Sequence, residues 1–274
     1  MMVEALVYFF VPALVGVLIG IASGLLGIGG GTVMVPIFRL AFGMSATMST
    51  ATSLFAIIPT SISGAISHVK GKTCIPALGI AAGLGGACLS PVGVWLAQLS
   101  PDWLVMLAAA LIIGYSAINM FKKAFKLRPA GQPAAGVDAA APTAYDSSLS
   151  RKQLLQGAAI GLVAGLASGY VGVGGGFIMV PLMLSIIGIP MRKASGTSLI
   201  AVMILAIPGV IEQGIIGNIN YLAGIAIVIG TIPGAVIGAR LVTKVPERTL
   251  RLLFGCFLIV AAVMLVLNEV GIFG

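Results

Sequence analysis

One segment of 17 residues occurs twice in this chain of 274 residues, at an offset of 145 positions. Residues 20–36 read GIASGLLGIGGGTVMVP, residues 165–181 read GLASGYVGVGGGFIMVP, and 11 of the 17 positions are identical. Without a gap, the same offset places the sequence Thr-Ser-Leu of residues 52–54 on that of residues 197–199. The repeat predicts two homologous halves that fold as two copies of one unit.

The composition of both halves requires a lipid environment. Hydrophobic residues make up 59% of the chain and charged residues 8%, whereas a soluble domain is about 25% charged. Each half has four long apolar segments and one that is too short to cross about 30 Å of hydrocarbon at about 1.5 Å per residue. The expected segments are residues 5–26, 31–42, 45–67, 74–98 and 103–121, then 153–171, 176–188, 194–213, 220–242 and 248–268. This pattern predicts an all-α integral membrane protein.

A polar stretch separates the two halves. Residues 122–152 are rich in Ala and Pro and carry basic residues at both ends, which is typical of a flexible linker. We therefore divide the chain into a first transmembrane repeat (1–121), a cytoplasmic linker (122–152) and a second transmembrane repeat (153–274).

The basic residues predict the topology, because Lys and Arg in short loops stay on the cytoplasmic side. The basic loops are the linker and those with Lys70 and Lys72, with Arg192 and Lys193, and with Lys244 and Arg248. If each short segment completes one passage, all of these loops are cytoplasmic, both termini are outside, and Arg39 is the exception. Five passages per half is an odd number, so the repeats are expected to be inverted, as in many secondary transporters. Whether the short segments cross or re-enter stays open.

Each short segment follows a glycine-rich turn. Non-helical backbone at membrane depth is tolerated only where it is buried in protein or lines a wet cavity. Inverted symmetry is expected to bring the two turns together near the midplane, where the free N–H groups of the short helices could bind an anion. Close helix packing through the glycines is the alternative. The candidate residues are Gly27, Gly29, Gly30 and Gly31 in the first turn, and Gly172, Gly174, Gly175 and Gly176 in the second.

Hydroxyl groups follow the turns in both halves. The first half carries Ser45, Ser49, Thr52, Ser53, Thr60, Ser63 and Ser67 mostly every three or four residues, hence along one side of a helix. Thr52 and Ser53 match Thr197 and Ser198, and we assign these two pairs to the substrate site. Hydrogen bonds to carbonyl groups or to neighbouring helices are the structural alternative for any single hydroxyl.

Three further polar residues are candidates for a gate or funnel. His68 and Gln213 are equivalent and lie at segment ends, where anchoring at the membrane surface is the favoured interpretation. Arg240 fits a snorkelling residue or part of a cytoplasmic anion funnel equally well. The three cysteines lack the spacing of a metal site and are interpreted as packing residues, and we expect no metal and no cofactor.

The motifs resemble those of the TauE/SafE family of sulfite exporters and related permeases. In both, each tandem half opens with a Gly-x-Gly-Gly-Gly turn, continues with an apolar stretch that ends in Pro, and then has a Thr-Ser-Leu element. The resemblance covers nearly the whole chain and implies that the two turns and the two Thr-Ser pairs are the substrate region. It also implies a small sulfur-containing anion as the substrate. Phe177 replaces Thr32 and Gly196 replaces Ala51 in the second half, so the site is not symmetric.

We therefore expect a secondary transporter in the bacterial inner membrane that exports sulfite or an organosulfonate such as sulfoacetate by alternating access. An anion that leaves a cell with a negative interior gains about 2.3 kcal/mol per charge per 100 mV, and no Asp or Glu lies mid-segment to couple an ion. An importer of thiosulfate or a sulfonate, or a membrane subunit that does not transport, is the alternative.

One histidine and the lack of mid-membrane carboxylates argue against an enzyme, so no catalytic residue is expected. The expected partners are the anion and membrane lipids, and not nucleic acid. A homo-oligomer stays open.

Overall fold

The structure, a computed structural model, describes residues 2–126 and 150–269, and within them it is helical with no strand. The first half contains α1 (Met2–Leu26), α2 (Gly31–Phe42), α3 (Ala46–Lys70), α4 (Pro76–Leu99) and α5 (Asp102–Lys126). The second contains α6 (Arg151–Val171), α7 (Gly176–Leu182), the π-helix η1 (Met183–Ile187), α8 (Met191–Ile216), α9 (Tyr221–Leu241) and α10 (Glu247–Glu269). All ten predicted segments are helical. α5 continues into the predicted linker, of which residues 127–149 lie outside the described residues.

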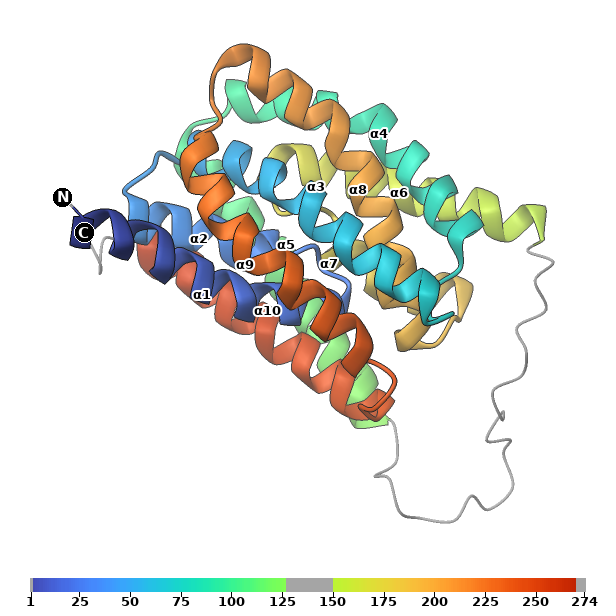
Figure 1. The fold of residues 1–274 in the computed structure, drawn as a ribbon. Helices are drawn as coiled ribbons and strands as arrows, with labels where there is room; N and C mark the ends of the chain where they lie inside the picture. Colours follow the sequence, from blue (N-terminus) through green and yellow to red (C-terminus); the bar gives the residue numbers. More distant parts are fainter. Residues whose placement is uncertain (1, 127–149, 270–274) are drawn as a thin grey trace.

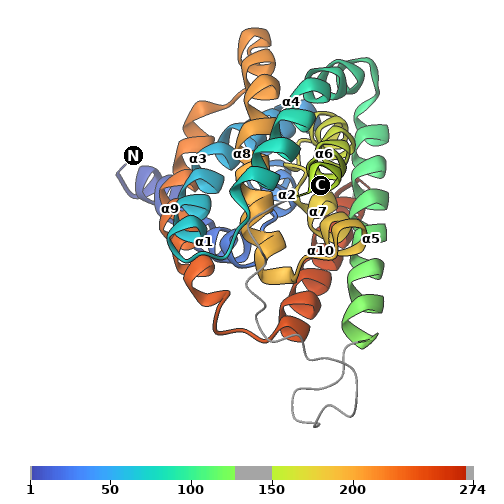
Figure 2. The same ribbon diagram turned by 90° about the vertical axis from the view of Figure 1, so that its right-hand side faces the viewer.

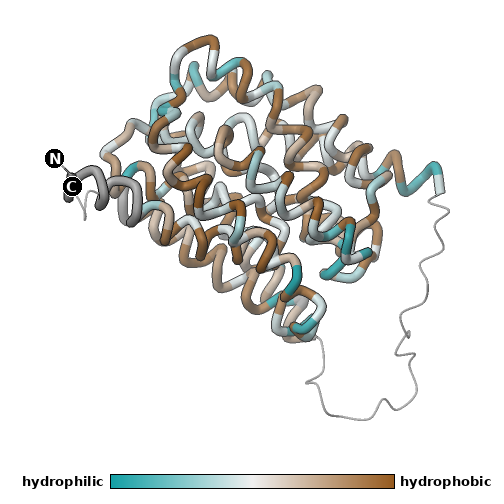
Figure 3. The backbone as a smooth tube through the Cα atoms, viewed as in Figure 1, coloured by the Kyte–Doolittle hydropathy of each residue, from teal (hydrophilic) through white to brown (hydrophobic). Residues whose placement is uncertain are grey.

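The helices have the lengths and the surface of a membrane protein. Seven of the described helices (α3, α4, α5, α6, α8, α9 and α10) are long and apolar enough to cross a membrane. α2 has 12 residues, and α7 with η1 also spans 12, so both remain too short to cross. Most positions along the helices are hydrophobic or intermediate in hydropathy, and the most hydrophilic ones gather toward helix ends and loops (Figure 3). The chain is a multi-pass membrane protein.

The helices of the two halves interlock in matched pairs. α1 packs against α9, and its equivalent α6 packs against α4, the equivalent of α9 (Figure 1). In the same way, α3 packs on α9 and α8 packs on α4. α5 and α10, which are each other's equivalents, lie side by side (Figure 2). Each of these contacts thus has a counterpart, an arrangement consistent with the predicted inverted repeat.

Glycines let the paired helices touch through their backbones. A Cβ atom added at Gly20 of α1 would lie 2.8 Å from the Cα of Thr231 in α9. The equivalent addition at Gly165 of α6 would lie 2.5 Å from the Cα of Gly86 in α4. Without an apolar driving force between helices in lipid, such close backbone packing is a main source of helix association.

Acidic residues cap the two long central helices. Asp102 Oδ2 accepts a hydrogen bond from the Ala46 amide at the start of α3, at 3.3 Å. Glu247 Oε1, its counterpart, accepts one from the Met191 amide at the start of α8, also at 3.3 Å. A carboxylate at a helix N-terminus satisfies a free amide and favours the helix dipole. The caps also fix the starts of α5 and α10 beside α3 and α8.

Three of the predicted cytoplasmic loops meet at one end of the molecule, which we call the basic end. Arg192 donates a hydrogen bond to the Val245 carbonyl at 2.9 Å, which joins the start of α8 to the loop after α9. Burial raises the pKa of the Cys74 thiol in the loop after α3, and the nearby Lys193 ammonium opposes that rise. Three loops that are far apart in sequence thus lie together, as the positive-inside pattern requires.

Candidate functional site

The two predicted glycine turns are present, and each precedes a short helix. Gly29 and Gly30 have φ angles of +81° and +87° before α2 begins at Gly31. Gly174 and Gly175 have φ angles of +88° and +67° before α7 begins. These angles lie in the left-handed region, which glycine adopts at no steric cost. The turns therefore depend on glycine for their shape.

The two turns touch each other inside the protein. Residues 27–31 and 172–176 are all buried. A Cβ atom added at Gly31 would lie 2.5 Å from the Val173 carbonyl oxygen, and one at Gly176 would lie 2.9 Å from the Cα of Ile28. Each turn thus packs its first helical residue against the backbone of the other, so the meeting of the two turns predicted from the sequence is observed.

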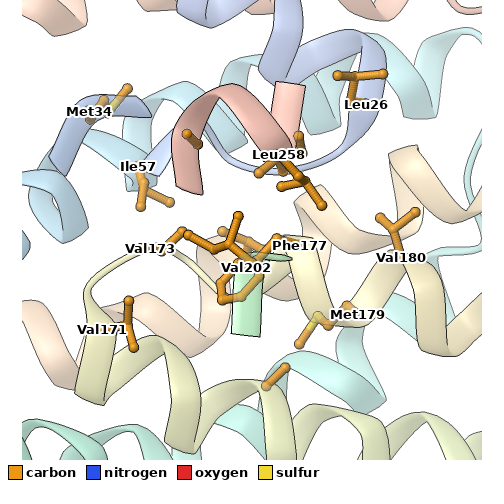
Figure 4. Packing of buried hydrophobic residues seen from close by; sticks show 14 of the residues in the cluster. Leu26, Met34, Ile57, Val171, Val173, Phe177, Met179, Val180, Val202 and Leu258 are labelled. Atoms are coloured by element: carbon orange, nitrogen blue, oxygen red, sulfur yellow. The ribbon is translucent and has the colours of Figure 1, made fainter. Parts of the chain in front are cut away.

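Apolar side chains fill the surroundings of this contact (Figure 4). Ile57 of α3 and Val202 of α8 are equivalent residues, and both are fully buried. A Cβ atom at Gly29 would lie 3.0 Å from Val202 and 3.3 Å from Ile57, and one at Gly174 would lie 2.8 Å from Ile57. Ile57 therefore contacts both turns. The centre of the protein is closed by this pair in the conformation described.

The helix starts at the turns keep free backbone donors. Among the described residues, the amides of Gly31 and Thr32 in α2 and of Phe177 in α7 donate no hydrogen bond. The positive end of a helix dipole points in the same direction as such amides. Two sets of donors thus lie close together, as an anion site without a buried Lys or Arg requires.

Unpaired hydroxyl groups lie beside the first turn. Ser23 of α1, Thr32 of α2 and Ser61 of α3 are fully buried, and their hydroxyls have no partner among the described residues. The Ser61 hydroxyl lies 3.5 Å from the position of a Cβ at Gly29, and the Ser23 Cβ lies 3.7 Å from one at Gly30. Their counterparts are Ser168, Phe177 and Ala206, of which only Ser168 carries a hydroxyl. The first turn is therefore the more polar one.

The predicted site residues Thr52 and Thr197 make matched hydrogen bonds to the protein. Thr52 Oγ1 accepts from the Asn220 amide at 3.0 Å, and Thr197 Oγ1 accepts from the Ile75 amide at 2.9 Å. Asn220 and Ile75 are the N-cap residues of α9 and α4. Sequence reasoning missed this role, although the amides that are bound are also 145 positions apart. Both threonines anchor a helix start of the opposite half.

The other predicted pair, Ser53 and Ser198, is not symmetric in its contacts. The Ser198 hydroxyl lies 2.7 Å from the Gly27 carbonyl and 2.8 Å from that of Ser195, and it donates to these acceptors. Ser198 thus ties α8 to the first glycine turn. The hydroxyl of Ser53 is buried and has no partner among the described residues.

The prediction that His68 and Gln213 anchor at the membrane surface is wrong. Their side chains are 0% and 1% exposed. His68 Nε2 donates to the Gly24 carbonyl of α1 at 2.7 Å, and Nδ1 lies 2.7 Å from Thr73 Oγ1. Gln213 Oε1 accepts from Asn218 Nδ2 at 2.8 Å. His68 turns inward toward a carbonyl of another helix, which a linear sequence does not show, whereas the partner of Gln213 lies in the loop directly after its own helix.

The hydroxyl track of α3 faces α9. The hydroxyls of Thr60 and Thr231 lie 2.5 Å apart, and the Ser63 hydroxyl donates to the Ile232 carbonyl at 2.8 Å. We call this contact the α3–α9 seam. Helical spacing predicted the track, but it could not identify the helix that the track contacts.

Cavities open on the surface of the described residues, and two of them differ in their lining. One of about 340 Å³ lies at the basic end between the ends of α3 and α9, where Arg240 and Lys70 line it. The other, of about 820 Å³, lies among α4, α5, α6, α7 and η1. Its lining residues are mostly apolar and include no cation, so only the first cavity suits an anion. No group of three or more His, Cys, Asp or Glu side chains in the described chain is placed to hold a metal ion.

Comparisons with known proteins agree with this architecture. A family model described as sulfite exporter TauE/SafE matches residues 12–265. The probable membrane transporter protein YunE of Bacillus subtilis (strain 168) is 28% identical over 97% of this chain and 99% of its own length. The probable membrane transporter protein YdhB of the same organism is 28% identical over 87% of this chain and 92% of its own length. A probable membrane transporter protein of Haemophilus influenzae is 29% identical over 93% of this chain and 97% of its own. No solved structure matches.

Proposed function

The chain belongs to the TauE/SafE sulfite exporter family and is a membrane transporter, not an enzyme. From this premise, we propose that it exports a small sulfur-containing oxyanion by alternating access. Sulfite or an organosulfonate such as sulfoacetate is the proposed substrate. The bacterial inner membrane is the proposed location, with both termini outside and the basic end in the cytoplasm.

The observation that carries this proposal is the contact between the two glycine turns. Each half contributes one short helix start, and the buried amides of Gly31, Thr32 and Phe177 donate no backbone hydrogen bond within the described residues. Partly buried amides and helix dipoles bind an oxyanion without a fixed cation. A site without a buried cation also leaves the anion free to dissociate, which a transporter requires.

Alternating access would separate the two turns. Ile57 and Val202 close the centre now, and the matched contacts of α3 and α8 with α9 and α4 allow two related packings of one half on the other. In this mechanism Ser23, Thr32, Ser53 and Ser61, whose hydroxyls are unpaired, donate to the anion once the centre opens. Thr52 and Thr197 position α9 and α4 around it.

Uptake of a sulfur compound is the second candidate, and Glu212 is the observation that favours it. Glu212 lies near the end of α8 that is opposite the basic end, and its Oε2 is buried without a hydrogen-bond partner. A carboxylate in this position could carry a proton inward with an anion.

Transport into and out of proteoliposomes tests both candidates. We expect sulfite or sulfoacetate to leave vesicles faster when their interior is made negative, and neither chloride nor protein-free vesicles to show this. Accumulation that requires an inward proton gradient, and that Glu212→Gln abolishes, would establish uptake instead. Equal fluxes with and without protein, for every sulfur anion tried, would contradict both.

A further inference from the structure

The cavity at the basic end combines two cations with several hydroxyls. Its lining residues are Ser67, Lys70, Gly71, Thr73, Ala239, Arg240 and Thr243. Lys70 and Arg240 lie in the last turns of α3 and α9, where the helix dipole favours positive charge. With a volume of about 340 Å³, the cavity is large enough for a small oxyanion and part of its hydration shell.

The two cations have no anionic partner in the described part of the chain. Neither Lys70 nor Arg240 forms a salt bridge there, and no acidic residue lines the cavity. Thr73 Oγ1 already bonds to His68, and the Thr243 hydroxyl donates to the Arg240 carbonyl. The Ser67 hydroxyl makes no hydrogen bond to another described residue. Two positive charges and one free hydroxyl thus face a shared space.

The equivalent positions at the opposite end have none of these groups. Ile215 and Trp95 stand where Lys70 and Arg240 stand, and Glu212 takes the place of Ser67. The Glu212 carboxylate repels an anion, and neither Ile215 nor Trp95 supplies a positive charge to attract one. Among the described residues, the positions that carry Lys70 and Arg240 at the basic end therefore have no cation at their equivalents at the opposite end.

The cavity is linked to the first glycine turn. Thr73 of the cavity bonds to His68, and His68 Nε2 donates to the carbonyl of Gly24, three residues before Gly27. From Ser67, the polar α3–α9 seam continues inward through Ser63 to the Thr60–Thr231 pair. Both links lead from the cavity toward the turn that has the unpaired hydroxyls.

From these observations we infer that Lys70, Arg240 and Ser67 form a loading site, where a small oxyanion binds before it enters the centre. The occupant is the free sulfur oxyanion of the transport reaction, and the inference rests on the proposed function. A lipid phosphate has the same charged oxygens, so the test must separate the two sources. Because the site exists at one end only, it favours binding from the basic end and supports export.

Binding of radiolabelled sulfate to the purified full-length protein tests the site. The protein is placed in nanodiscs of phosphatidylcholine, and the variants are Lys70→Gln, Arg240→Gln and the charge-preserving Arg240→Lys. Lys244→Gln is the matched control, because Lys244 is exposed at the same end and does not line the cavity. We expect Lys70→Gln and Arg240→Gln each to weaken sulfate binding ~10-fold. Arg240→Lys should retain most of the wild-type affinity, and the control should change the affinity less than about twofold. Elution as a single species in size exclusion verifies folding.

The outcomes distinguish the site from the transport function. Sulfate binding that is equal in the wild type and in both cavity Gln variants would overturn the loading site. Loss of wild-type binding in phosphatidylglycerol nanodiscs, but not in phosphatidylcholine, would assign the cavity to a lipid headgroup and also overturn it. Unchanged sulfite flux in Lys70→Gln and Arg240→Gln would overturn the loading site while the transport function stands. Binding that depends on both cations, without flux of any sulfur anion, would leave an anion site and remove the proposed function.

Discussion

The α3–α9 seam and the equivalent α4–α8 contact have the same backbone arrangement but opposite chemistry. Where the seam has the Thr60–Thr231 hydroxyl pair, the second contact has Leu205 and Gly86, and a Cβ atom at Gly86 would lie 2.8 Å from the Leu205 Cβ. Ser63 of the seam corresponds to Pro208, which has no hydroxyl. At these positions one contact is thus polar and leads to a cationic cavity, whereas the other has no hydroxyl pair.

The comparison separates the residues that maintain the fold from those that suit transport. The matched features are the glycine turns, the caps by Asp102 and Glu247, and the hydrogen bonds of Thr52 and Thr197. The unmatched features are the seam hydroxyls, the unpaired hydroxyls of Thr32 and Ser61 beside the first turn, and the cations of the cavity. A preferred direction of transport requires an asymmetric structure, so we expect the unmatched residues to determine that direction.

The largest effect is expected at the matched centre. Gly31→Ala adds a Cβ that would lie 2.5 Å from the Val173 carbonyl oxygen, and Gly176→Ala would collide with the opposite turn in the same way. Because backbone atoms cannot move aside, we expect each variant to lose several kcal/mol, about 3 or more, and to fold poorly. Fluorescence-detected size exclusion measures the folded yield.

Gly114→Ala is the control for these two substitutions, since nothing lies within 4 Å of its added Cβ. It should express like the wild type. If Gly31→Ala and Gly176→Ala also express like the wild type, the two glycine turns do not pack against each other at the centre of the protein.

The second effect is expected at the matched threonines. Thr52→Val and Thr197→Val keep the side-chain shape but leave the amides of Asn220 and Ile75 without an acceptor. Each should cost about 1–3 kcal/mol, and the two costs should be similar. Unfolding in mixed detergent micelles gives these values. Thr52→Ser, which keeps the hydroxyl, should stay close to the wild type; a large loss of transport in Thr52→Val at unchanged stability would instead assign Thr52 to the substrate.

The architecture followed from the sequence because periodicity and lipid chemistry constrain it strongly. Segment lengths predicted all ten α-helices, and the offset of 145 predicted which helices are equivalent. The π-helix η1 was not predicted, and α3 and α8 continue through Pro59 and Pro208, although proline usually interrupts a helix interior. Local irregularities in a helix depend on tertiary contacts, which the helix propensities of single residues do not describe.

The candidate site followed only in part. Glycine turns have a clear sequence signal, because only glycine adopts their φ angles at no cost. The roles of Thr52, His68 and Lys70 depend on partners in distant segments, namely Asn220, Gly24 and Arg240. No spacing rule pairs such residues, although the offset of 145 would have linked the two threonine hydrogen bonds once one of them was known.

A third prediction transfers one residue from the apolar end to the basic end. Ser67→Glu places the equivalent of Glu212 in the cavity beside Lys70 and Arg240. A carboxylate about 4–6 Å from the bound anion should weaken sulfate binding about fivefold through repulsion and partial neutralisation of the cations. Ser67→Gln has the same size without the charge and should weaken binding less than about twofold. Equal effects of both substitutions would show that size, and not charge, controls the cavity.

The smallest effect is expected within the polar seam itself. The hydroxyls of Thr60 and Thr231 face each other at 2.5 Å, and each also lies near a carbonyl of its own helix, Ala56 at 2.7 Å and Val228 at 3.4 Å. A double-mutant cycle of Thr60→Val and Thr231→Val should give a coupling of only about 0.6 kcal/mol, because the carbonyls remain available to whichever hydroxyl is left. Thr60→Val combined with Thr50→Val, whose hydroxyl bonds to Thr47 of its own turn, should show no coupling. A stability coupling this small, together with a much larger loss of sulfite flux in the double variant, would mean that the seam hydroxyls act in transport of the anion and not in stabilising the helix contact. Equal losses of stability and flux would mean that the two hydroxyls only hold α3 to α9. The difference between the α3–α9 seam and the α4–α8 contact would then not explain the direction of transport.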